Sequence, residues 1–112
     1  MSGRTNRQEF KGRVRSWAER LEVPIDTVTI RPMVTKWASC STAGNLTFNE
    51  ELLELEEDVR DYVIVHELLH FHAPNHGRLW KSLMHAHLGD YEELDRRLRR
   101  HHAGQLSRVH RS

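Results

Sequence analysis

The sequence lacks both the cysteine pairs that stabilise small secreted proteins and the long apolar segments that place a protein in a membrane. Only one of its 112 residues is cysteine, Cys40, so no internal disulfide can form. No stretch approaches the roughly 20 apolar residues of a membrane span. Residues 1–6 are polar and no apolar segment follows them, unlike a secretory signal. These absences predict a cytoplasmic protein in a reducing environment, with no membrane partner.

An excess of charge of one sign is also missing. The sequence contains seventeen Lys and Arg residues and sixteen Asp and Glu residues, and the formal net charge is +1. Acidic residues crowd into 50–61 and arginines into the segment from 96 onward, so a nucleic-acid partner is possible but is not indicated by net charge. The length suits one modest core. We expect a single domain over 1–112 with flexible tails at 1–5 and 101–112, and a monomer is compatible with this composition.

Histidine is abundant instead, with nine residues, and two of them form the most informative segment of the chain. His66-Glu67-Leu68-Leu69-His70 is an H-E-x-x-H arrangement. On an α-helix, His66 and His70 are one turn plus about 40° apart, so both imidazoles project from one face toward a single metal ion. Glu67 lies about 100° round from His66, where its carboxylate can act as general base on a water that the metal activates. The pattern predicts a zinc hydrolase that cleaves amide bonds.

A catalytic zinc site needs a third protein ligand and one open position, and His76 is the best candidate for the ligand. On a continued helix His76 would lie about 240° round from His70, so the helix must end between them. Pro74 disfavours helical geometry at Ala73, and Asn75 can cap a new helix whose first turn carries His76 back to the ion. Three histidines also suit iron or manganese, so zinc, one ion per chain, is inferred from the motif rather than from the ligand type.

Hydrophobic periodicity predicts an α+β fold. Apolar residues at helical spacing predict an amphipathic helix over 6–22. β-Branched alternation and turn residues predict strands at 25–32, 35–40 and 45–49, which should form a small antiparallel sheet of about three strands. Further helices are expected at 50–56, 58–72, 76–88 and 91–100, the first and last capped by Asn49 and Asp90. The sheet should pack against the helix that carries the metal ligands.

Several other reactive side chains are better explained by structure than by chemistry. A lone thiol in a strand, as at Cys40, usually packs against its neighbours. His72 would point some 200° away from His70 and is interpreted as a satisfied histidine. The residue that stabilises the oxyanion stays unassigned, because Tyr91, Arg78 and His72 qualify by residue type alone.

Four segments together extend the pattern beyond the zinc motif: Trp37-Ala-Ser-Cys-Ser, Gly44-Asn-Leu-Thr-Phe-Asn, 61–70 and Asn75-His-Gly-Arg-Leu-Trp. In this order and spacing they resemble the YgjP-like family of small zincin metallopeptidases, which are related to SprT-like proteins. The resemblance implies a zincin fold whose edge strand receives an extended peptide or protein substrate. It also implies zinc ligands at His66, His70 and His76 and a general base at Glu67. Ala38 and Leu79 replace the glycine and phenylalanine that are usual in the family.

Two alternatives use the same residues differently. In a binding module the three histidines would hold a structural zinc, but such a site needs no base at Glu67 and usually contains cysteine. In a SprT-like or nucleic-acid-associated zinc protein the arginine-rich ends would bind nucleic acid, and peptidase activity would be weak or missing. Salt-sensitive DNA binding would favour that second alternative.

Overall fold

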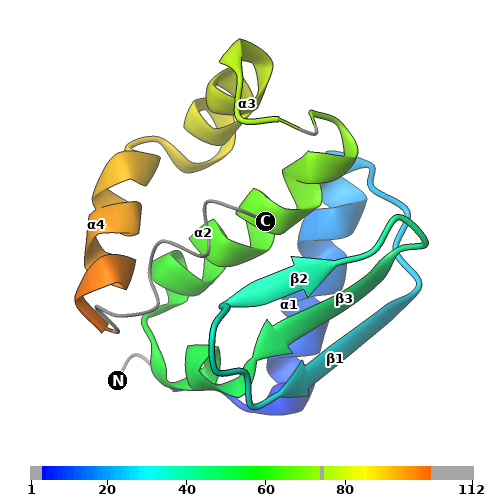
Figure 1. Ribbon diagram of the computed structural model, residues 1–112, viewed down its shortest axis with the longest axis vertical. Coiled ribbons are helices and arrows are strands. Elements are labelled where there is room, and N and C mark those ends of the chain that lie inside the picture. Colours follow the sequence, from blue (N-terminus) through cyan, green and yellow to red (C-terminus); the bar gives the residue numbers. More distant parts are fainter. Residues whose placement is uncertain (1–3, 74, 102–112) are drawn as a thin grey trace.

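The computed structural model describes residues 4–73 and 75–101. A first helix is followed by a three-stranded sheet, and the remaining helices come after the sheet (Figure 1). The elements are α1 (Arg7–Leu21), β1 (Thr27–Arg31), β2 (Ala38–Cys40), β3 (Asn45–Asn49), the 3-10 helix η1 (Glu50–Glu54), α2 (Glu57–Leu68), the 3-10 helix η2 (Leu69–Phe71), α3 (Arg78–Leu88) and α4 (Tyr91–His101). The predicted α+β class with three strands is confirmed.

The sheet differs from the prediction in the direction of one pairing. Its order is β1-β3-β2, with β2 antiparallel to β3 but β1 parallel to β3. The wholly antiparallel sheet was therefore a wrong prediction. The connection at 32–37 carries the chain past the middle of the sheet, so that β3 returns between the two earlier strands. As a result β2 is an edge strand, and it lies on the side of the sheet nearest α2 (Figure 1).

The turn between β2 and β3 depends on a glycine. Gly44 has φ of +91°, in the left-handed region, and its amide donates to the carbonyl of Ser41 at 3.1 Å. A β-carbon on Gly44 would also lie 3.1 Å from the backbone nitrogen of Asp26. Both the conformation and the close approach favour glycine here. The predicted turn at 41–44 is confirmed.

Helix α1 covers one face of the sheet (Figure 1). Asn6 caps its first turn, accepting from the amide of Glu9 at 2.8 Å. Phe10 packs edge to face on Phe48 of β3, with ring centroids 5.2 Å apart. The helix ends at Leu21, and the next residue adopts a left-handed conformation before Pro24 is reached. The amphipathic stripe read from the sequence is thus the face that is buried against the sheet and α2.

Helix α2 runs through the middle of the molecule, with the sheet and α1 on one side and α4 on the other (Figure 1). Its residues from Val59 to Leu68 are all buried, so it has no solvated face over that length. The prediction of a helix over 58–72 needs correction, because regular α-helix stops at Leu68 and a 3-10 turn continues to Phe71. A helix buried on nearly all sides holds its side chains in fixed positions, which suits it to carry a binding site.

Two predictions for the ends of the chain are changed by the structure. Thr5, expected in a loose tail, donates from its backbone to the carbonyl of Leu53 at 3.0 Å. Helix α4 extends to His101, one residue beyond the expected end. The remaining tail residues, 1–3 and 102–112, lie outside the described residues. Among the helices that are described, none has the length and apolar composition needed to cross a membrane.

Candidate metal centre

The three predicted ligand histidines come from three successive segments. His66 lies on the last turn of α2 and is fully buried. His70 lies on η2, and His76 lies in the segment just before α3. Both are half-buried. The tighter 3-10 turn does not prevent convergence, because His70 still follows His66 by about one helical turn.

The chain reaches His76 by a different route from the one predicted. The new helix begins at Arg78 rather than at His76, and its cap is Gly77. Asn75 does not cap the helix but closes a short turn, its side-chain oxygen accepting from the amide of Gly77 at 3.0 Å. The proposed role of Pro74 falls on a residue outside the described ranges. The break between the two histidines is confirmed, whereas the helical position of His76 is not.

The three imidazoles form a compact triangle. Ring centroids are 5.2 Å apart for His66 and His70, 5.0 Å for His66 and His76, and 5.0 Å for His70 and His76. One nitrogen from each ring can be chosen so that all three lie within 4.8 Å of one another. Neutral imidazole nitrogens in such an arrangement are ligands for zinc and for other first-row transition metals.

The shortest of these separations fits a tetrahedral ion closely. Two nitrogens bound to one tetrahedral zinc at about 2.0–2.1 Å are about 3.3 Å apart. The Nε2 atoms of His70 and His76 lie 3.3 Å apart. In the metal-free protein the same distance permits a hydrogen bond between the two rings. The donor set and its spacing therefore fit one metal ion with three histidine ligands.

Aromatic side chains pack against the clustered imidazoles. Trp80 of α3 is buried and stacks on His76 with ring centroids 4.4 Å apart, and it packs edge to face on His66 at 5.2 Å. Tyr62, one turn before His66 on α2, packs on the His66 ring at 5.8 Å. The Tyr62 hydroxyl donates to Asp95 of α4 at 2.9 Å. Burial, together with this carboxylate, raises the pKa of Tyr62, so the hydroxyl stays a donor.

Glu67 is buried next to the ligands. It is 1% exposed, and its Oε2 lies 3.6 Å from Nδ1 of His66. The thiol of Cys40, on edge strand β2, interacts with the Glu67 carboxylate. Burial, with the charge and hydrogen bonding of Glu67, raises the pKa of Cys40 to about 11. The thiol is therefore neutral near pH 7 and acts as a weak donor rather than as a thiolate ligand.

Other candidates from the sequence lie apart from the triangle or at its border. Nε2 of His72 lies 2.7 Å from the carbonyl oxygen of Leu21 at the end of α1, in keeping with a satisfied histidine. Arg78 lines a separate surface pocket with His85. Tyr91 lines a pocket of about 220 Å³ together with His76, so it is the oxyanion candidate that lies beside one of the three clustered histidines.

A sequence model described as "YgjP-like, metallopeptidase domain" matches residues 2–101. The chain belongs to the YgjP-like family. The predicted family and zincin-like fold class are confirmed, and family membership implies a metal ion and a peptide substrate. No curated protein matches the sequence of this YgjP-like chain.

Two solved structures share the fold of this YgjP-like chain. The metallopeptidase zymogen jannalysin of Methanocaldococcus jannaschii has 26% identity and a TM-score of 0.71, over 80% of this chain and 92% of that one. The metallopeptidase zymogen abylysin of Pyrococcus abyssi has 22% identity and a TM-score of 0.74, over 84% of this chain and 95% of that one. Each alignment spans more than nine-tenths of the solved structure's chain, so the likeness covers a complete fold.

The supporting residues of the centre were not identified from the sequence. Trp80 falls in the predicted helix at 76–88 and Tyr62 in the predicted helix at 58–72, and neither spacing indicates a contact with the three histidines. Asp95 has no local pattern that sets it apart from the other acidic residues. One signal was available, since a metal-bound histidine usually has a neighbour that orients its ring. Only the tertiary arrangement shows which residues those neighbours are.

Proposed function

We propose that this protein is a zinc-dependent peptidase. In this proposal His66, His70 and His76 hold one zinc ion, and Glu67 is the general base. The observation that carries it is the convergence of three imidazoles beside a buried glutamate on a fixed helix, in a chain of a metallopeptidase family. Zinc is preferred to iron or manganese because the H-E-x-x-H arrangement is typical of zinc hydrolases.

The chain's own residues have defined tasks in peptide hydrolysis. When bound, zinc supplies a Lewis acid that lowers the pKa of a water to about 7 and polarises the scissile carbonyl. Glu67 accepts a proton as the water oxygen bonds to the carbonyl carbon. Glu67 then delivers that proton to the nitrogen as the carbon–nitrogen bond breaks, so the products are a carboxylic acid and an amine. Its burial beside His66 keeps this carboxylate close to the reacting atoms.

The contacts of the arginines weigh against the nucleic-acid alternative. In α4, Arg97 pairs with Asp58 and Glu56, and Arg99 pairs with Asp95 at 2.8 Å. Arg96 pairs with a glutamate of the same helix at 2.8 Å. A guanidinium that already binds carboxylates has fewer donors left for phosphate. In this proposal Arg96, Arg97 and Arg99 therefore support the fold through their ion pairs.

A glutamate substitution tests the proposal. Glu67→Gln keeps the shape of the side chain but removes its basicity, so we expect zinc to stay bound while hydrolysis of a peptide mixture falls by about 100-fold or more. Glu19→Gln, the same change on an exposed residue of α1, is the matched control and should keep full activity. Equal activity in both variants would contradict the role of Glu67. A zinc-loaded wild type without any hydrolysis would contradict the function itself.

A further inference from the structure

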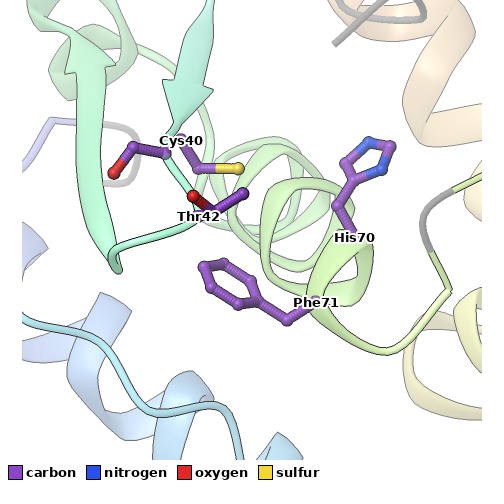
Figure 2. Close-up of a pocket in the computed structure, with 5 residues that line it drawn as sticks. Cys40, Thr42, His70 and Phe71 are labelled. Carbon is purple, nitrogen blue, oxygen red and sulfur yellow. The ribbon is translucent and has the colours of Figure 1, made fainter.

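A pocket of about 310 Å³ lies between the end of β2 and the 3-10 turn η2. Its lining residues are Cys40, Ser41, Thr42, His70 and Phe71. Figure 2 shows the Cys40 sulfur directed from the strand toward the helix, with the Phe71 ring extending from the helix toward the strand. His70, one of the three clustered histidines, forms part of the same wall. The pocket therefore opens directly beside the candidate metal centre.

The walls of this pocket favour an apolar occupant. The Phe71 ring and the Cys40 thiol line the space together with Ser41, Thr42 and His70, and none of the lining residues is Asp, Glu, Lys or Arg. The raised pKa of Cys40 keeps the thiol uncharged near pH 7. Pockets that hold whole ligands are roughly 300–1,000 Å³ in volume. This pocket lies at the lower end of that range, so it suits a single large side chain.

The free edge of β2 supplies a way to deliver such a side chain. The amide of Asn49 donates to Trp37 at 2.9 Å, and the amide of Ser41 donates to Asn45 at 3.0 Å. Hydrogen-bonded pairs recur every second residue in an antiparallel ladder, so the backbone groups of Ala38 and Cys40 point away from β3. No described strand pairs with that side of β2. A peptide added there would pair with these two residues.

Register connects the open edge with the pocket. Residues directly opposite each other on neighbouring strands place their side chains on the same face of a sheet. The Cys40 side chain lies on the face that meets Glu67 and lines the pocket. The peptide residue paired with Cys40 would therefore direct its side chain into the pocket. The adjoining backbone would pass His70.

We propose that this pocket is a specificity subsite that takes one large apolar side chain, such as leucine, phenylalanine or methionine, within one or two residues of the scissile bond. The inference rests on the proposed peptidase function and adds the class of substrate. It assigns Thr42 and Phe71 as residues that determine specificity. The backbone of Cys40 pairs with the peptide, and its side chain forms part of the pocket wall.

A binding experiment separates the subsite from catalysis. N-acetyl-leucinamide and N-acetyl-asparaginamide have side chains of similar shape, but the first is apolar and the second is polar. Each is titrated into the zinc-supplemented Glu67→Gln protein while the backbone amide signals are followed by NMR. We expect the leucine probe to shift the amides of 40–42 and of Phe71, with an affinity about tenfold or more above that of the asparagine probe. Equal affinities, or shifts confined to other parts of the chain, would overturn the proposal.

Two threonine variants locate the effect. Thr42→Phe should fill the pocket from an exposed position and reduce binding of the leucine probe by about tenfold, whereas Thr35→Phe, an exposed threonine before β2, should leave it unchanged. Unchanged binding in Thr42→Phe would also overturn the proposal. The readout does not depend on hydrolysis, so a failure of the peptidase function would appear only in the Glu67 activity comparison and not here.

Discussion

Nε2 of His70 and Nε2 of His76 lie 3.3 Å apart, although the chain changes from a 3-10 turn to an irregular segment and then to a new helix around them. This proximity does not follow from helical periodicity. It depends on the turn that Asn75 closes at Gly77 and on the stacking of His76 against buried Trp80. His76 is therefore positioned by tertiary contacts, whereas His66 and His70 are brought together by their spacing across the α2–η2 junction.

Removal of the third histidine should remove the metal. We expect the His76→Ala protein to bind zinc at least about 100-fold more weakly than the wild type, since loss even of a residue that only orients a ligand costs about 10–100-fold. Elemental analysis should then give one zinc per chain for the wild type and much less for the variant. His72→Ala is the matched control, because His72 bonds to the end of α1 instead. Equal zinc content in the two variants would remove His76 from the ligand set.

Spacing was enough to predict that the first two histidines lie together. His66 and His70 are four residues apart, and an α-helical turn brings such a pair to the same side, even though His70 already lies in η2. The break between His70 and His76 was also predicted, from Pro74 and from Asn75 as a helix cap, although Asn75 closes a turn instead of capping α3. The sequence therefore predicted which histidines lie together, and their roles stay a prediction.

The missed features depend on long-range contacts. Nothing in the β-branched run at 27–31 specifies that its partner is β3, because the direction of pairing is decided by where the connection at 32–37 leads. Likewise, α3 begins at Arg78 rather than at the predicted His76, because the Asn75 side chain bonds within the turn instead of capping a helix. Local patterns predict which elements form, but packing decides their partners and their ends.

Asp61 should be important for stability rather than for catalysis. It is 8% exposed and accepts two bonds from Arg13, at 2.7 and 2.6 Å, and one from the indole of Trp17 at 3.0 Å. These bonds tie α1 to α2, the helix that carries His66. Asp61→Ala leaves the Trp17 donor buried without this partner, so we expect the free energy of unfolding of the metal-free protein to fall by about 2–4 kcal/mol in urea titrations.

A surface ion pair provides the comparison for Asp61. Glu93 and Arg96 of α4 pair at 2.8 Å, but their side chains are 42% and 58% exposed. Solvent screens such a pair, so Glu93→Ala should lower the free energy of unfolding much less than Asp61→Ala does. Similar losses in Glu93→Ala and Asp61→Ala would show that the buried network adds nothing beyond an exposed pair.

Asn49 should hold the connection that leads into the edge strand. It is 1% exposed, its amide nitrogen donates to the carbonyls of Met33 and Lys36 at 2.9 and 3.0 Å, and its oxygen accepts from the amide of Glu51 at 3.0 Å. Asn49→Ala loses all three bonds, and we expect thermal or urea unfolding to show a loss of about 1–3 kcal/mol. The position of β2 depends on this connection, so peptidase activity should fall with it.

Two further substitutions distinguish hydrogen bonding at Asn49 from general damage. Asn49→Asp keeps an acceptor for Glu51 but directs a charged carboxylate at two carbonyl oxygens, so it should be at least as destabilising as Asn49→Ala near neutral pH. Asn45→Ala, at an exposed position on the same strand, should change stability by well under that amount. A stable Asn49→Asp protein would contradict the two donor contacts.

The thiol of Cys40 should react slowly, and its pH profile should report the environment of Glu67. Burial raises its pKa from 9.0 to about 11, with a further contribution from the Glu67 carboxylate. Only the thiolate is alkylated, so at about pH 8 the folded, metal-free protein should contain about 100-fold less reactive thiolate than a cysteine of ordinary pKa, since each unit is tenfold. Its iodoacetamide rate should keep rising to about pH 11, whereas the unfolded chain should level off above about pH 9.

Substitution of Glu67 should shift the pH profile of Cys40 alkylation in a known direction. Glu67→Gln removes a negative charge beside the thiol, so forming the thiolate becomes easier and the pKa of Cys40 should move down, while burial still holds it above the value in the unfolded chain. The measurement is the pH at which the alkylation rate reaches half its maximum, because that midpoint does not depend on how accessible the sulfur is. A midpoint that is the same in the wild type and in Glu67→Gln would show that the thiol and the carboxylate do not interact, and it would remove Cys40 from the surroundings of the base.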